Sequence, residues 1–338
     1  MYTVLISAVG GDIGQGILKS LRLVRPPVRI IGCDMSPNTP GPFLCDKGYI
    51  VAGAKKDEKK YIQDIVRICK QEKVDAVFSA QPYELNALCP LRDSLQHRTG
   101  AYFAVQTKDV WGVCMDKLRT YQCLKKAGIR SPETYATKKG FDVLVKKYGY
   151  PVLVKRKSSL GSGFHDCNLI NKKRDFEKAW KEIENPIVQE YITDKNNEEY
   201  TVGVFLDKNS KALGAISMLR ELRFGLTFHA IVDDFPDVAD VAVKAVESIG
   251  SVGPCNVQLR RDRAGEPCVI EINARMSSTT AFRTHFGFNE AQACMDYFLN
   301  HKKPHLSYKK GVAMKAWAEV YTSISQYRNL KKKRVLFP

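Results

Sequence analysis

The sequence of 338 residues lacks the signals that mark several classes of protein. None of its ten cysteines falls in a Cys-x-x-Cys pair, so the spacing typical of zinc sites and redox motifs is absent. No apolar run approaches the ~20 residues of a membrane helix, and the N-terminus MYTVLISAVGG has no basic signal-peptide region. No nucleic-acid motif and no internal repeat is present. We therefore expect a cytoplasmic protein with reduced cysteines, no membrane span and no nucleic-acid partner.

What the chain has is positive charge. The formal net charge is +17, on a chain whose 44% hydrophobic and 26% charged residues are ordinary for a globular protein. A basic surface attracts anions, such as nucleotides and phosphorylated or carboxylated substrates. The lysine-rich runs at 55–60, 172–174 and 331–334 are interpreted as solvated faces. We expect small-molecule substrates, one of them anionic.

The first third of the chain alternates apolar strands with amphipathic helices, which predicts a parallel sheet covered on both faces. The segment GGDIGQG follows the first strand and opens a helix. Its glycines, at positions 10, 11, 14 and 16, do not fit the Gly-x-Gly-x-x-Gly fingerprint of dinucleotide-binding proteins. A Rossmann oxidoreductase is therefore a distant alternative.

The strongest pattern is NVQLRRDRAGEPCVIEINAR, two predicted strands joined by a charged turn. Side chains alternate along a strand, so Glu271 and Asn273 share a face, which Gln258 on the neighbouring strand can join. Three such oxygen-bearing side chains suit Mg²⁺, with Mn²⁺ as an alternative. Arg275 adds a cation on the same face. A solvent-facing hairpin with one polar side is the structural alternative.

Two weaker patterns point to a nucleotide. In GYPVLVKRKSSLGSGF, Lys155 ends an apolar strand, and the loop carrying Ser159, Gly161, Ser162 and Gly163 can fold its N–H groups over phosphates. In VQEYITDKNNEEYTV, the peptide groups of residues 189–192 can read an adenine edge, and Glu199 can accept from ribose hydroxyls. Each pattern taken alone is better explained by an ordinary surface loop. The four hinge positions are Gln189, Glu190, Tyr191 and Ile192.

In this order and spacing the motifs resemble those of ATP-grasp enzymes, most closely the synthetase halves of the carbamoyl-phosphate synthase large subunit and similar stand-alone ligases. The resemblance covers about residues 109–300, and the first third resembles the preATP-grasp domain. It implies that Lys117 and Lys155 contact the α- and β-phosphates, that Glu190 and Tyr191 flank the adenine, and that Arg275 stabilises the transferring phosphoryl group. Ser278 stands where carbamoyl-phosphate synthases have arginine, which argues against carbamoyl phosphate synthesis.

The predicted fold is α/β, with a Rossmann-like parallel-sheet domain followed by two α+β subdomains that clasp ATP. The predicted boundaries are 1–112 for the preATP-grasp domain, 113–195 for the small lid subdomain, 196–320 for the subdomain with the metal site, and 321–338 for a basic tail.

Other candidate residues follow from charge and position. Arg220 and Arg223 are expected to bind the acceptor carboxylate or the γ-phosphate, with surface charge paired to Glu221 as the equal alternative. Glu84 follows a strand of the first domain and is a candidate substrate contact or helix cap, and Ser278 is a further substrate position.

The sequence thus predicts an ATP- and Mg²⁺-dependent ligase that activates a carboxylate as an acyl phosphate and couples it to an amine. The alternatives are a carboxylate or carbamate kinase and a non-catalytic nucleotide-binding regulator. The two substrates stay undefined, because substrate pockets are built from loops that spacing does not decode. The oligomeric state also stays open, with a homodimer as one alternative.

Overall fold

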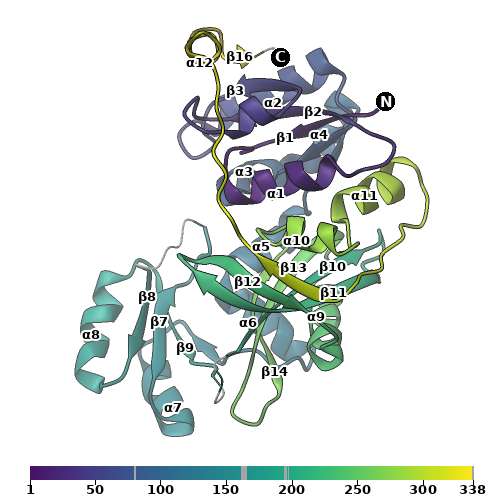
Figure 1. Ribbon diagram of the computed structural model, residues 1–338. Coiled ribbons are helices and arrows are strands. Elements are labelled where there is room, and N and C mark those ends of the chain that lie inside the picture. Colours follow the sequence, from purple (N-terminus) through teal and green to yellow (C-terminus); the bar gives the residue numbers. More distant parts are fainter. Residues whose placement is uncertain (80, 161–165, 194–195, 197, 337–338) are drawn as a thin grey trace.

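A computed structural model describes residues 1–79, 81–160, 166–193, 196 and 198–336. Within these residues three sheets follow one another along the chain (Figure 1). None of the helices described is both long and apolar enough to cross a bilayer.

The N-terminal domain is built on a sheet ordered β16-β3-β2-β1-β4-β5, parallel except for β16. Its strands are β1 (Thr3–Ile6), β2 (Arg29–Asp34), β3 (Lys47–Ile50), β4 (Ala76–Phe78), β5 (Tyr102–Ala104) and β16 (Val335–Leu336). Its helices are α1 (Asp12–Leu21), α2 (Glu58–Glu72), α3 (Pro82–Leu88), α4 (Arg92–Thr99), α5 (Lys108–Met115) and α12 (Ile324–Lys333). Because side chains alternate, Val4 and Ile6 pack with α1, whereas Leu5 packs with α2 on the other face.

The C-terminal segment returns to this first domain. After β15 (Gly311–Met314) the chain runs back to α12 and β16, and β16 pairs antiparallel with β3 at the edge of the sheet (Figure 1). Leu330 of α12 is fully buried and packs with Ile50 of β3. Residues 324–336, predicted as part of a basic tail, therefore form an edge strand and a covering helix, while the lysines at 331–333 stay exposed.

The lid domain (residues 134–190) has a four-stranded sheet ordered β6-β9-β7-β8. Its elements are β6 (Thr134–Tyr135), α7 (Lys139–Tyr148), β7 (Val152–Arg156), β8 (Cys167–Ile170), α8 (Lys173–Glu182) and β9 (Pro186–Glu190). The helix α6 (Lys117–Lys126) precedes it. The hydrophobic cluster of this domain contains lid residues only, among them Phe141, Val154 and Phe176.

The third sheet is ordered β14-β13-β10-β11-β12-β15, and every pair is antiparallel. Its strands are β10 (Glu199–Leu206), β11 (Ala212–Arg223), β12 (Leu226–Val232), β13 (Gly253–Arg261), β14 (Pro267–Asn273) and β15 (Gly311–Met314). Three helices accompany it: α9 (Pro236–Ser248), α10 (Thr280–His285) and α11 (Glu290–Cys294).

The first and third domains share one hydrophobic cluster. It joins Ile17 of α1 to Phe205 of β10, Ile216 of β11 and Ala291 of α11. The opposite face of the third sheet packs against α9 through residues such as Val202. Apolar burial therefore fixes the first and third domains to each other, whereas the lid domain keeps a core of its own.

Candidate functional site

The hairpin β13–β14 projects four polar side chains from one face. Gln258 lies directly opposite Glu271, and Asn256 lies opposite Asn273. The residues between them, such as Val257 and Ile272, are buried in the cluster beneath the sheet. The alternation seen in the sequence therefore gathers Gln258, Glu271 and Asn273, the predicted metal ligands, on one face.

Two lysines lie close to this hairpin. Lys117 begins α6, whose N-terminus is capped by Asp116, and its Nζ donates to Ser159 Oγ at 3.0 Å. Burial lowers the pKa of Lys117, and the nearby Glu271 opposes that shift. In β7, burial together with the charge of Lys117 lowers the pKa of Lys155 to about 8. Two adjacent buried cations favour a bound anion, because an anion stabilises the protonated form of each lysine.

A cavity of ≈ 370 Å³ lies among these groups and the hinge strand β9. It is lined by both lysines, by the four hinge residues and by the hairpin. Its lining includes Lys117, Lys155, Gln189, Glu190, Tyr191, Ile192, Gln258, Arg260, Ile270 and Glu271. The structure thus brings together most of the residues predicted to bind ATP.

The polar side chains of the hinge strand are held by hydrogen bonds to other residues of the protein. Gln189 Nε2 donates to Thr134 Oγ1 at 2.8 Å, and the carboxylate of Glu190 is held by Arg130. Both side chains are already engaged, and the Glu190 N–H donates to the Glu133 carbonyl at 2.9 Å. The side chains of Tyr191 and Ile192 line the cavity together with Pro132, Leu153 and Ile270, and these provide a surface for a flat ring.

A second cavity, of ≈ 550 Å³, lies between the first domain and the third sheet. The carboxyl ends of β1 and β4 contribute Ser7 and Gln81, the position at which α/β sheets collect ligands. The opposite wall carries cations, amides and hydroxyls. It comprises Arg220, Asn256, Gln258, Glu271, Asn273, Arg275, Ser277 and Ser278. Gln258 and Glu271 line both cavities, so these two side chains form a common wall.

Arg275 is a fixed part of that second cavity. Its Nη2 donates to Asn273 Oδ1 at 2.8 Å and its Nη1 to the carbonyl of Met276 at 2.9 Å. Its buried Nε has no hydrogen-bond partner among the described residues. Burial lowers the pKa of Arg275, and Glu271 opposes the shift. The guanidinium is therefore held ready for an anionic group.

Glu199 lies between the two cavities without lining either. Its side chain is 9% exposed and forms ion pairs with Arg220 and with Arg260, the latter at 2.7 Å. Burial raises the pKa of Glu199, but the two arginines outweigh it and the net shift is downward. Glu199, the predicted ribose contact, is thus paired with two arginines. Arg260 lines the first cavity and Arg220 lines the second.

The two arginines predicted to act together are separated in the structure. Arg220 lines the second cavity, whereas Arg223 lies three residues further along β11, beyond a register shift at 221–222. Arg223 is 54% exposed, pairs with Glu221 at 3.6 Å and lies over the ring of Phe228. For Arg223 the surface-charge alternative describes the geometry.

The remaining predicted residues fall in three places. Ser278 lines the second cavity, but Glu84 lies beneath its floor, where its carboxylate accepts from Ser7 Oγ at 2.5 Å and from Ser79 Oγ at 3.0 Å. Burial raises the pKa of Glu84 to about 7. The predicted loop positions Gly161, Ser162 and Gly163 lie outside the described residues.

Sequence reasoning missed Asn256 and Arg260. Both follow the same alternation as Gln258, two residues before and two residues after it on β13. Asp12, at the start of α1, also lines the second cavity and forms an ion pair with Lys315. Its sequence position near GGDIGQG carried no signal of that contact, because Lys315 lies about three hundred residues away in the chain.

The side chains predicted to bind a metal can hold a hard cation only if the amide oxygens of Gln258 and Asn273 serve as ligands beside Glu271. No group of three or more His, Cys, Asp or Glu side chains that could hold a metal occurs in the described ranges. The hairpin β13–β14 offers one carboxylate, Glu271, beside the amide oxygens of Gln258 and Asn273. Such a sparse set fits Mg²⁺, which takes one or two carboxylates and completes its shell with phosphate oxygens and water.

Comparisons with known proteins address the fold. Residues 182–320 match a family model described as ATP-grasp in the biosynthetic pathway with Ter operon, and residues 6–99 match the PylC-like N-terminal domain. A curated D-alanine–D-alanine ligase from Fusobacterium nucleatum is 32% identical over 107 residues, which is 32% of each chain. This match therefore spans about a third of that relative's length.

Solved structures resemble nearly the whole chain. The N5-carboxyaminoimidazole synthetase of Staphylococcus aureus, complexed with ADP, has a TM-score of 0.69 at 19% identity, over 93% of this chain and 80% of that one. An L-amino acid ligase from Bacillus licheniformis has a TM-score of 0.65 at 16% identity, over 88% and 74%. The expected α/β architecture, with a parallel-sheet domain ahead of the clasping domains, is confirmed.

Proposed function

We propose that this chain, which has the ATP-grasp fold, is an ATP-dependent ligase that activates a carboxylate as an acyl phosphate and joins it to an amine. The observation that carries the proposal is the common wall: Gln258 and Glu271 line a cationic cavity on one side and a second polar cavity on the other. Phosphoryl transfer needs a donor and an acceptor on either side of one charge-stabilising group.

The first cavity is the proposed nucleotide site. Lys117 and Lys155 lie beside Glu271, where bound phosphates would stabilise the protonated form of both lysines. Tyr191 and Ile192, at the hinge, provide a surface for the base. The structural neighbour from Staphylococcus aureus was solved with ADP, which supports a nucleotide in this fold.

Gln258, Glu271 and Asn273 would hold the divalent cation. Asn273 Oδ1 already accepts a hydrogen bond from Arg275, so this proposed cation ligand is also bonded to a guanidinium. When bound, the cation neutralises phosphate charge. The residues themselves orient the phosphates at the common wall and keep Arg275 aimed at the acceptor side.

The second cavity is the proposed acceptor site. An oxygen of the substrate carboxylate attacks the γ-phosphorus, the bond to the β-phosphate oxygen breaks, and ADP leaves. The nitrogen of an amine then attacks the acyl carbon, phosphate leaves, and the amine gives up a proton. Arg220 and Arg275 favour an anionic substrate here, and enclosure between two domains protects the acyl phosphate from water.

The test is ADP release in the presence of ATP, Mg²⁺, pooled carboxylates and pooled amines. We expect ADP formation that requires both pools, and loss of that signal in Glu271→Gln. Omitting the amines separates the alternatives: ADP turnover with the carboxylates alone, as fast as with both pools, identifies a carboxylate kinase. No ADP above background with any pool would rule out both enzymes and leave the nucleotide-binding regulator.

A further inference from the structure

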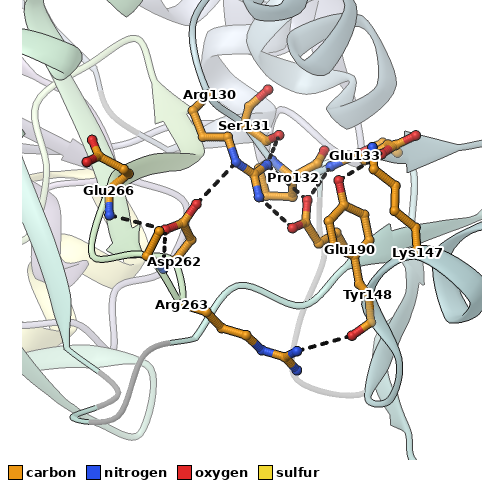
Figure 2. Close-up of polar contacts among 12 residues, drawn as sticks. Arg130, Ser131, Pro132, Glu133, Lys147, Tyr148, Glu190, Asp262, Arg263 and Glu266 are labelled. Carbon is orange, nitrogen blue, oxygen red and sulfur yellow. Dashed lines mark hydrogen bonds and ion pairs between the residues drawn. The ribbon is translucent and has the colours of Figure 1, made fainter.

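A group of polar side chains at the edge of the first cavity joins the lid domain to the hairpin β13–β14 (Figure 2). We call it the hinge cluster: Arg130, Glu133, Glu190 and Asp262. Arg130 Nη1 and Nη2 donate to the two oxygens of Glu190 at 2.9 and 2.5 Å. Its Nε lies 3.5 Å from Asp262 Oδ2, in the turn of the hairpin. One guanidinium thus spans from the lid strand β9 to the hairpin that carries the common wall.

The backbone beside Arg130 makes the same connection. The carbonyl of Arg130 accepts from the N–H of Val269 in β14 at 3.0 Å. Three residues later the carbonyl of Glu133 accepts from the N–H of Glu190 at 2.9 Å, and Glu133 N–H donates to Glu190 Oε2 at 3.0 Å. Pro132, between them, lines the nucleotide cavity. The segment 130–133 is therefore a short bridge under the base end of that cavity.

Polar contacts matter here because apolar packing does not hold the lid domain in place. Its hydrophobic cluster contains lid residues only, whereas the first and third domains share a cluster. The Glu190 side chain is only 5% exposed, so without Arg130 it is a buried charge that keeps the N–H of Glu133 as a partner but loses its cation. Movement of β9 toward water would lower the free-energy cost of this buried charge.

We infer that Arg130 is a positioning residue for adenine recognition: by clamping the Glu190 side chain, it holds the peptide groups of residues 190–192 at a fixed distance from the catalytic hairpin. This inference rests on the proposed nucleotide site and adds to it the residue that sets the geometry of its base end. Arg130 itself acts through Glu190 and not through the nucleotide.

The experiment measures the affinities of the full chain for ADP, GDP and pyrophosphate, each with Mg²⁺, by calorimetry. In Arg130→Met we expect the Kd for ADP to rise about tenfold, as expected for the loss of a charge-assisted hydrogen-bond pair. The Kd for pyrophosphate should stay unchanged, because Lys117 and Lys155 are untouched. The preference for ADP over GDP should shrink, because a displaced strand no longer distinguishes base edges.

Three further variants keep the test decisive. Arg130→Lys retains the charge but loses the two-pronged grip and should fall between wild type and Arg130→Met. Glu190→Gln keeps the side-chain shape and should reproduce the loss of base preference. Lys147→Met removes an exposed ion pair, Lys147–Glu133 at 2.7 Å, from the edge of the cluster and should leave all three affinities within about twofold.

The possible results separate the inference from the function. If wild type binds ADP but Arg130→Met and Arg130→Lys bind ADP and GDP as wild type does, Arg130 positions nothing. If the variants lose ADP and pyrophosphate equally, the cluster supports only general stability, and the inference is equally overturned. If wild type binds neither ADP nor pyrophosphate, the proposed nucleotide site itself is wrong.

Discussion

The lowered pKa of Lys155 makes a quantitative prediction about nucleotide binding. Burial and the neighbouring Lys117 lower the pKa of Lys155 to about 8 in the free protein, so its proton is lost between about pH 7 and pH 9. A phosphate binds the protonated lysine, and therefore at high pH binding must also take up a proton. The sign follows directly: ADP affinity is highest below about pH 8 and falls as pH rises through that value.

The size of the effect follows from the same pKa. At about pH 7 roughly nine-tenths of free Lys155 is protonated, and at about pH 9 roughly one-tenth, so the Kd for ADP should rise ~10-fold between them. Isothermal calorimetry at several pH values, in buffers of different ionisation enthalpy, measures both the affinity and the proton uptake. Proton uptake on binding should grow toward one per ADP above about pH 8.

Two variants decide whether Lys155 is the group responsible. The Lys155→Arg variant carries a guanidinium that stays charged throughout this range, so its ADP affinity should be nearly independent of pH between about 7 and 9. Lys173→Met, which removes an exposed lysine of α8, should keep the wild-type profile. A Lys155→Arg variant with the same tenfold fall as wild type would refute the assignment.

Three other predictions test separate parts of the structure. Glu271→Gln should lower ADP release at least ~100-fold while leaving ADP binding within a few-fold, measured by turnover and calorimetry, because Glu271 is the one carboxylate among the proposed ligands of the cation that neutralises the charge of the transferred group. As pH rises from about 4.5 to about 7, Glu84→Gln should gain stability relative to wild type by up to about 3 kcal/mol in denaturant unfolding. The reason is that the pKa of buried Glu84 is raised, so ionisation destabilises wild type in this window. Parallel curves of unfolding free energy against pH for the two proteins would contradict this. Leu330→Ala should cost about 2–5 kcal/mol in the same assay if α12 is an integral part of the first domain, and a neutral result would mean that this segment does not pack there.

The sequence predicts this fold well where hydrophobic periodicity is strong. The apolar strand at residues 3–6 and the helix over 58–72 alternate as a parallel sheet requires, and the structure places them so. The pairing of β16 with β3 could not be predicted, because a two-residue strand is too short to show a hydrophobic periodicity and its partner lies far away in the sequence. The run of lysines after Leu330 suggests a solvated tail, although Leu330 and Leu336 on either side of it are buried.

The site residues, too, could be predicted where local strand geometry places them and could not be predicted where distant segments meet. Alternation within one hairpin places Gln258, Glu271 and Asn273 on a common face, because strand geometry alone decides it. Contacts made between distant segments have no such signal. The carboxylate of Glu190 is expected near adenine, yet its partner is Arg130, sixty residues earlier, and that pairing depends on how two domains meet. Spacing along the chain carries no information about that meeting.

The case of Glu199 shows what the missing information changes. The family resemblance assigns the acid at the start of β10 to ribose, because it suggests a hydroxyl partner there. In the structure the acid is 9% exposed and bonded to Arg220 and Arg260. A carboxylate buried between two guanidiniums offsets much of the desolvation cost of all three groups, and removing it would leave two cations facing each other. Since Arg260 lines the nucleotide cavity and Arg220 the acceptor cavity, this single buried charge fixes one cation on each side of the common wall. We therefore propose that Glu199 acts on both cavities through the arginines, and the two ion pairs explain why the position is acidic.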